Sequence, residues 1–205
     1  MDPEEALYDE ASTIYSPDGR LLQVEYALKA VKKGSTILGL KYNKGIILIA
    51  YKEQNSILID INSVEKIFEI DKNIFCAITG IAADARLLVD LARTEAQIYN
   101  LWYGEKITLK QLVESIGETL HLYTQFDGIR PFGTTLLIAG LNNSEEKIYA
   151  TDPSGAFFSY RAFCAGKGSE IASSILEKQY NPKLTKNQAI VLVKSILKRI
   201  YKKKI

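Results

Sequence analysis

The sequence is poor in the residues from which disulfides, metal sites and histidine-dependent active sites are built. It has two cysteines and one histidine in 205 residues. Cys76 and Cys164 both lie in apolar runs, which favours free buried thiols over a disulfide framework. His121 has no second histidine or carboxylate cluster near it, so neither a metal site nor a Ser/His pair is predicted. We therefore expect no metal and no other cofactor.

Long apolar runs and an excess of charge are also missing. No segment approaches the ~20 uncharged apolar residues that a bilayer span requires, and the N-terminus, MDPEEALYDE, is acidic where a secretory signal would be basic and then apolar. The formal net charge is only +2, and the basic end KRIYKKKI is typical of a solvated helix terminus. We therefore expect a cytoplasmic protein that binds neither membranes nor nucleic acids.

Two positions of the sequence exclude a phosphate-binding glycine loop. The segment AFCAGKGSEIA places a glycine-rich turn between a strand and a helix, but Arg161 and Gly168 stand where a P-loop requires Gly and then Ser or Thr. We interpret this turn as structural. The chain also has no internal repeat and no low-complexity tract.

What is present is the composition of a soluble globular protein, with 47% hydrophobic and 24% charged residues. The length suits one domain over residues 1–205. Asn43, Lys44 and Gly45 join two β-rich runs as a hairpin, and SILIDI, IFEID and IFCAITG follow as strands, which together predict a β-meander.

In the rest of the chain the spacing of apolar residues is first that of helices, then that of strands, and then again that of helices. Leu87, Leu88, Leu91, Ile98 and Leu101 recur at helical spacing and predict a first central helix. In chain order we predict two helices over 83–105 and 108–125, strands over 134–142, 147–152 and 156–166, and two helices over 168–180 and 185–203. Helices segregated in pairs do not form alternating βαβ units. The order predicts an α+β fold, a four-layer αββα sandwich.

An amphipathic helix over 20–33 precedes this sandwich in the stretch YSPDGRLLQVEYALKAVKKGST. Ser16, Pro17 and Gly19 match the preferences of a type I turn. The helix that follows has an apolar stripe formed by Leu21, Val24, Leu28 and Val31. The stripe is compatible with a helix across the open end of the sandwich, a contact with a neighbouring subunit, or ordinary packing on its own domain.

The segment Gly34–Ser35–Thr36 at the start of the first strand carries a candidate nucleophile. Cleavage after Gly34 would free a hydroxyl residue whose own amine serves as base, as in N-terminal nucleophile hydrolases. Such a site also needs a lysine, for which Lys66 is the candidate, and an acid, which is not evident.

These features resemble the α-type subunits of proteasomes, most closely the single-type α subunits of archaea. Residues 15–36 are similar to the α-type signature, and the likeness extends in order from Tyr8 to about Ser195 through YDEAST, NSVEKIFEID, GIAADARLLVDLAR, YTQFDGIRPFGTTLLIAG and TDPSGAFFSYRA. The resemblance implies a non-catalytic subunit of the 20S core in a seven-membered outer ring. Residues 1–14 would gate the entry of unfolded substrates, and residues 35–205 would form the sandwich.

The resemblance also implies partners and site residues. The partners are other α subunits, β subunits and a regulatory ATPase ring that acts in ATP-dependent protein degradation. Lys66 and Gly80 match a pocket that docks the C-terminal tails of the ATPases. The gate residues that it implies are Tyr8, Asp9, Pro17 and Tyr26.

Three departures from the family pattern stand out. Glu10 replaces an arginine, and Tyr51 stands where the family has an acid, so a local salt bridge is expected to be missing. The last two strands and the final helix of α subunits have no counterpart, which predicts an unpaired sheet edge, left by truncation or covered by another chain. Two alternatives remain: an active hydrolase cleaved after Gly34 that uses Ser35 with Lys66, and a ring or adaptor without a protease partner.

Overall fold

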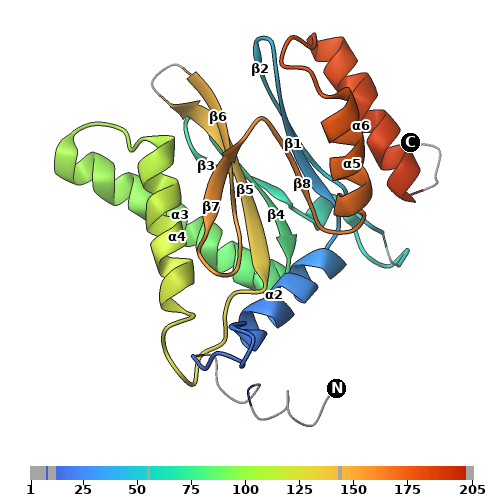
Figure 1. Cartoon of the computed structure of the whole chain (residues 1–205). Helices are drawn as coiled ribbons and strands as arrows, with labels where there is room; N and C mark the ends of the chain where they lie inside the picture. The colour runs from blue at the N-terminus through green and yellow to red at the C-terminus, as the bar shows by residue number, and fades with distance from the viewer. Residues whose placement is uncertain (1–7, 9–12, 55, 143–144, 202–205) are drawn as a thin grey trace.

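The computed structural model describes residues 8, 13–54, 56–142 and 145–201. Two antiparallel sheets lie face to face, with strand orders β2-β1-β8 and β3-β4-β5-β6-β7 (Figure 1). The strands are β1 (Ile37–Tyr42), β2 (Gly45–Ala50), β3 (Ile67–Asp71), β4 (Ile74–Gly80), β5 (Thr134–Asn142), β6 (Glu145–Thr151), β7 (Phe157–Tyr160) and β8 (Ala162–Ala165). The helices are α2 (Leu22–Lys33), α3 (Ala82–Tyr103), α4 (Leu109–Leu122), α5 (Ser169–Gln179), α6 (Lys186–Tyr201) and the short 3₁₀ helix η1 (Ile61–Ser63).

The helices form the two outer layers of the fold. α3 and α4 cover the five-stranded sheet, and α5 and α6 cover the three-stranded sheet. α2 crosses one end of the sandwich and packs against β4 and β5 (Figure 1). The predicted four-layer αββα sandwich is therefore confirmed, and α2 packs on its own chain.

Three apolar clusters correspond to the three interfaces between these layers. Ile116 and Leu136 belong to the cluster under α3 and α4, and Leu38 and Ile196 to the one under α5 and α6. A smaller cluster between the sheets includes Ile37, Leu137 and Ile148. Since each sheet contributes alternate side chains to its two faces, both sheets are apolar on both sides.

The first third of the chain is not a single meander. The hairpin at 43–44 is confirmed, with Tyr42 opposite Gly45, and β3 and β4 form a second hairpin. These hairpins belong to different sheets, however, and the predicted strand SILIDI does not form. In its place the chain turns, then enters η1, whose cap Asp60 accepts a hydrogen bond from the N–H of Asn62 at 2.9 Å. Ile57 and Leu58 are almost fully exposed.

The predicted strand over 156–166 is divided between the two sheets. β7 pairs with β6 in the five-stranded sheet, whereas β8 pairs with β1 in the other. Arg161 lies at the break, so the chain crosses from one sheet to the other within one residue. The turn predicted before β7 is confirmed by a hydrogen bond from the Gly155 N–H to the Asp152 carbonyl at 3.0 Å.

The first central helix is confirmed as α3. Of the five residues whose spacing predicts it only Leu88 is buried, and the core-facing side of α3 also carries Ala85, Val89, Ala92 and Ala96. Large apolar side chains remain on the opposite side, which we call the outer stripe of α3. The outer stripe consists of Leu87, Leu91, Ile98, Leu101 and Trp102.

The capping box of the last helix and the free cysteines are confirmed, whereas Leu28 of the stripe predicted for the N-terminal helix is exposed. Thr185 and Gln188 form the expected capping box before α6, with the Thr185 N–H donating to the Gln188 side chain at 2.9 Å. Cys76 and Cys164 are free and buried, and burial raises the pKa of each thiol to about 12. Among the helices that the structure describes, none is both long enough and apolar enough to cross a bilayer.

Candidate functional site

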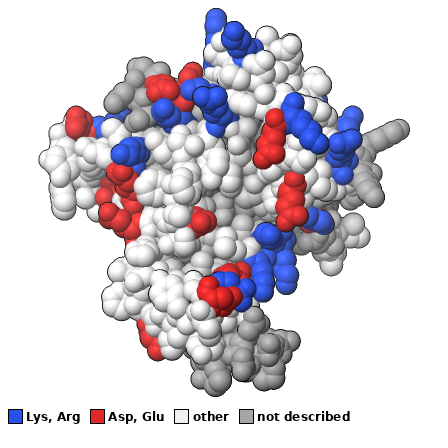
Figure 2. Space-filling model, in the orientation of Figure 1, with Lys and Arg blue, Asp and Glu red and all other residues white. Residues whose placement is uncertain are grey.

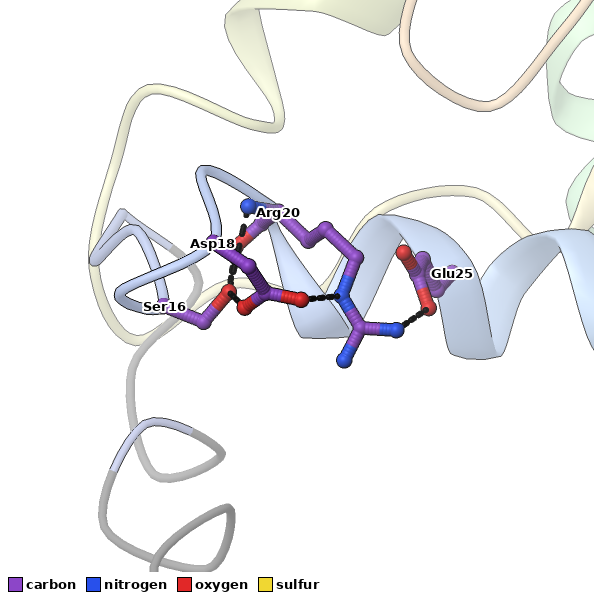
Figure 3. A network of polar contacts seen from close by, with 4 residues as sticks. All are labelled: Ser16, Asp18, Arg20 and Glu25. Atoms are coloured by element: carbon purple, nitrogen blue, oxygen red, sulfur yellow. Dashed lines mark hydrogen bonds and ion pairs between the residues drawn. The ribbon is translucent and has the colours of Figure 1, made fainter.

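A polar network fixes the turn that leads into α2. The Gly19 N–H donates to the Ser16 carbonyl at 2.8 Å, which confirms the predicted turn, and Gly19 has φ +78°. The Ser16 hydroxyl donates to Asp18 at 2.7 Å, and the Arg20 guanidinium contacts Asp18 at 2.8 Å and Glu25 at 3.5 Å (Figure 3). The hydrogen bond from Ser16, with Arg20 nearby, lowers the pKa of Asp18.

This network fixes the start of α2 in place of a side-chain N-cap. The N-cap residue of α2 is Leu21, which has no side-chain oxygen to accept a hydrogen bond from the first turn. Glu25 lies in that first turn, where a carboxylate is favourable, and Arg20 connects it to the preceding turn. The entry into α2 is therefore fixed by side chains on both sides of Leu21.

The residues predicted for the gate lie on this N-terminal stretch. Tyr8 is in a turn and half-buried, Pro17 is exposed in the turn before α2, and Tyr26 is a half-buried residue of α2. The ammonium of Lys29 lies 4.8 Å from the Tyr26 ring centroid. Asp9, like Glu10, lies outside the described residues, so the joint role of the four gate residues stays a prediction.

The end of α2 meets β4 at a close backbone contact. Gly34 caps α2, and a Cβ on Gly34 would overlap the backbone of Gly80. A Cβ on Gly80, where φ is +101°, would overlap the Gly133 carbonyl. A Cβ on Gly166 would lie 2.8 Å from Gly34 O. We call the contact of residues 34 and 80 the Gly34–Gly80 junction, and its geometry requires glycine on both sides.

Ser35 follows this junction without forming a catalytic pair. Its hydroxyl is buried and has no hydrogen-bond partner among the described residues. Its carbonyl accepts from the Thr79 hydroxyl at 2.6 Å, which holds the backbone of the uncut segment. A serine nucleophile needs a base within hydrogen-bond reach. No described group lies in that position, and the base of an N-terminal nucleophile hydrolase would be the amine freed by cleavage after Gly34.

Lys66, the docking residue implied by resemblance, lies next to the Gly34–Gly80 junction. Its carbonyl accepts from the N–H of Ile78 at 3.0 Å, two residues before Gly80 on the neighbouring strand. Burial lowers the pKa of the half-buried ammonium, and the Glu53 carboxylate opposes that shift. The structure thus brings Lys66 and Gly80 to the same end of the β3–β4 hairpin.

Tyr51 stands at the position expected for an acid and packs as an aromatic. Its ring stacks on the ring of Tyr201 with 3.7 Å between centroids. The hydroxyls of Tyr201 and Thr36 lie 2.7 Å apart, and the Thr36 hydroxyl donates to the Lys167 carbonyl at 2.6 Å. Tyr51 therefore joins the end of β2 to the end of α6, where a charged carboxylate would have lacked this partner.

Asp84 supports the backbone next to the junction, and sequence reasoning did not single it out. It is buried at 4% exposure and accepts from Arg130 at 2.6 and 2.7 Å and from the N–H of Gly133 at 2.9 Å. These hydrogen bonds and the Arg130 charge lower its pKa. Asp84 and Arg130 occur in two segments already compared with proteasome α subunits, but neither segment indicates that they pair.

The lone histidine has no role at this site. His121 is exposed on α4, and its Nδ1 lies 3.4 Å from the Ser154 carbonyl. Within the described part of the chain no three His, Cys, Asp or Glu residues gather as a metal site would require. On the face shown in Figure 2, positive and negative side chains are intermixed.

Comparison with known families matches both the N-terminal helix and the sandwich to proteasome subunits. A family model described as "Proteasome subunit" matches residues 31–205, and a second model, for the N-terminal signature of the A-type proteasome subunits, matches residues 8–30. The boundary between the two matches falls within α2, just before the Gly34–Gly80 junction.

The relatives with similar sequences come from archaea and are named as alpha subunits of the proteasome. That of Thermococcus sibiricus is 48% identical over 198 residues, which are 97% of this chain and 76% of the relative. That of Archaeoglobus fulgidus is 49% identical over 185 residues, 90% of this chain and 75% of the relative. That of Methanocaldococcus jannaschii is 45% identical over 185 residues, 90% of this chain and 71% of the relative.

Proposed function

Because the chain belongs to the proteasome family and carries the N-terminal signature of its α-type subunits, we propose that it is a non-catalytic subunit of the 20S core. In this proposal it forms a seven-membered outer ring with other α subunits and contacts a ring of β subunits. The N-terminal segment gates the entry of unfolded chains, and a regulatory ATPase ring docks on the outer surface. The protein acts in ATP-dependent degradation in the cytoplasm.

One observation carries the non-catalytic assignment: the chain continues through the position where a catalytic subunit would begin. α2 buries Leu22, Val24, Ala27 and Val31 against the sandwich, and the Gly34 carbonyl accepts from the N–H of Lys167 at 2.7 Å. A free amine at Ser35 would require cleavage of this packed segment. The self-cleaving alternative therefore has no structural observation in its favour.

The mass of the purified subunit tests this assignment. We expect the full, uncut chain, since the Ser35 hydroxyl has no base beside it among the described residues. A subunit that begins at Ser35 would identify the protein as an active hydrolase.

The outer stripe of α3 supports assembly with other subunits. Leu101 and Trp102 are 80% and 77% exposed, and Leu87 is 64% exposed on the same side of the helix. Exposed apolar surface of this extent commonly marks a protein contact. Native mass spectrometry checks the assembly: a seven-membered or double seven-membered ring is expected, and a monomer in the presence of β subunits would contradict it.

Docking of the ATPase is proposed to depend on Lys66 and Gly80. An ammonium suits a terminal carboxylate, and glycine at position 80 permits the close backbone contact at the same end of the hairpin. Lys66→Ala should abolish stimulation of proteolysis by the ATPase while the ring still assembles. Lys72→Ala, on the exposed turn of the same hairpin, is the control and should be stimulated normally. Undiminished stimulation of Lys66→Ala would exclude this docking role.

A further inference from the structure

Lys167 shares the Gly34–Gly80 junction with Lys66, although the two lysines come from distant segments. Lys167 lies in the turn between β8 and α5. Its N–H donates to the Gly34 carbonyl at 2.7 Å, and its own carbonyl accepts from the Thr36 hydroxyl at 2.6 Å. The backbone of Lys167 is thus fixed against the same junction that Lys66 approaches from β3.

One carboxylate acts on both ammonium groups. Glu53 forms an ion pair with Lys167, with 3.2 Å between Oε1 and Nζ. Burial lowers the pKa of Lys66, and the Glu53 carboxylate raises it. Glu53 therefore contacts Lys167 directly and attracts the Lys66 ammonium at longer range, and the formal charges of the three side chains sum to +1.

The pair formed by Glu53 and Lys167 is open to exchange. The side chain of Lys167 is 54% exposed and that of Glu53 is 38% exposed. Exposed ion pairs are weak because water competes with them. The Lys167 ammonium also lies 5.8 Å from the Tyr201 ring centroid, so it keeps an aromatic contact when the carboxylate leaves.

We propose that Lys66, Lys167 and Glu53 form an exchangeable carboxylate site, in which the terminal carboxylate of a docking chain displaces Glu53 and pairs with both lysines. This inference rests on the docking role proposed for Lys66 and adds a second cation and a resident competitor to it. When no docking chain is bound, Glu53 occupies the site. Because a docking chain must displace Glu53, this carboxylate weakens the binding of every docking chain and sets the affinity of the site.

Glu53→Gln tests the interaction of Glu53 with Lys66 when no peptide is bound. Removing the charge of Glu53 should lower the pKa of Lys66, measured by NMR on isotope-labelled methylated lysines. Glu65→Gln is the matched control, because Glu65 is adjacent to Lys66 in the chain and exposed. We expect no shift of Lys66 in this control. An unchanged Lys66 pKa in Glu53→Gln would overturn the proposal.

Binding of a defined peptide tests the exchange itself. The probe is Gly-Ser-Gly-Ser-Leu-Ala with a free C-terminus, compared with its C-terminally amidated twin, on the assembled protein at low salt. Glu53→Gln should bind the free peptide roughly two- to fivefold more tightly than the unmodified protein, and Lys167→Gln more weakly by a similar factor, the range typical of exposed ion pairs. Binding of both peptides alike in Glu53→Gln would contradict a carboxylate site.

The two proposals fail in different ways. If Lys66→Ala abolishes stimulation by the ATPase but Glu53→Gln and Lys167→Gln leave peptide affinity unchanged, the docking role stands and the exchangeable site is wrong. If Lys66→Ala leaves stimulation unchanged, the docking role itself is wrong, whatever the peptide does.

Discussion

Asp84 is the residue on which several backbone groups near the junction depend. It joins the start of α3 to Arg130 and to the N–H of Gly133, and the Gly133 carbonyl in turn accepts from the N–H of Ile81 at 2.9 Å. We expect Asp84→Asn to lower the free energy of unfolding by about 2 kcal/mol, the range for hydrogen bonds to charged groups. Urea unfolding measures the change.

The matched control for this prediction is on the same helix. Asp90 is exposed and contacts Arg93 at 3.4 Å, so Asp90→Asn should change the free energy of unfolding by less than about 0.5 kcal/mol. Equal losses for the two variants would mean that the buried hydrogen bonds of Asp84 add nothing to the free energy of unfolding.

Asp84 also predicts a dependence of stability on pH. Its pKa is lower in the folded chain than in the unfolded chain, where it is about 3.9. Its contribution is therefore complete above the unfolded value and is lost as the pH falls through the folded value. The difference in unfolding free energy between the unmodified protein and Asp84→Asn should shrink below about pH 4. A constant difference down to pH 2 would contradict this assignment.

Gly80 tests the close backbone contact at the junction. A side chain there meets the Gly133 carbonyl and a φ of +101°, so Gly80→Ala should cost more than about 2 kcal/mol of unfolding free energy. Gly104 also has positive φ but has open space around it, and Gly104→Ala should cost about 1 kcal/mol. Similar costs would mean that the clash is relieved by backbone movement.

At the scale of elements, neighbouring residues of α3 separate the core from the surface. Leu88 is 1% exposed and Leu87 is 64% exposed. Leu88→Ala should therefore lower the unfolding free energy by roughly 3 kcal/mol, and Leu87→Ala by less than about 0.5 kcal/mol. Thermal unfolding of the two variants measures both effects. A large loss for Leu87→Ala would mean that Leu87 is packed against other residues in solution.

The sequence pattern identified every helix of the sandwich but not the side on which α3 packs. Periodicity arguments weigh large apolar residues, and here leucines lie on both sides of the helix. The buried side is defined instead by Ala85, Ala92 and Ala96, whose small side chains let the helix approach the sheet closely. In the sequence alone, alanine is as typical of a helix surface as of a helix core.

The segment SILIDI shows why a strand pattern can fail. Its alternation is that of a strand, but its polar side chains bond to the nearby backbone. The Ser56 hydroxyl accepts from the Leu58 N–H at 3.1 Å, and the Ser63 hydroxyl donates to the Asp60 carbonyl at 2.7 Å. These local hydrogen bonds replace the ladder of hydrogen bonds that a strand requires.

The docking residues, by contrast, came from family resemblance, and no sequence pattern pointed to Lys167 or Asp84.

For the whole molecule, the two sheets differ in width, and part of the wider one is uncovered. The inner face of β3, β4 and β5 carries Ile67, Phe75 and Leu141, which are 38%, 42% and 46% exposed. With Ile46 and Leu48 on the inner face of β2 they line a groove of about 500 Å³. Within the described residues β2 and β8 each have a neighbour on one side only, and the unpaired edge expected from the sequence stays a prediction.

We expect this groove to bind hydrophobic dyes. Phe75→Thr should reduce the fluorescence of a dye such as ANS and change the unfolding free energy by less than about 1 kcal/mol, since the ring is largely exposed. Val191→Thr removes an exposed apolar side chain of α6 that does not line the groove and serves as control. Unchanged fluorescence in Phe75→Thr would show that the groove is closed in solution.

The pairing of β1 with β8 and the hydrogen bond of Thr36 with Tyr201 have a consequence during synthesis on the ribosome. Ile37 lies opposite Ala165, and the Thr36 N–H donates to the hydroxyl of Tyr201, 165 positions later. At synthesis rates of roughly 5–20 residues per second, β8 is synthesised on the order of 10 s after β1. During that time the apolar side chains of β1 are exposed, so a chaperone that shields nascent strands should raise the yield of folded chain.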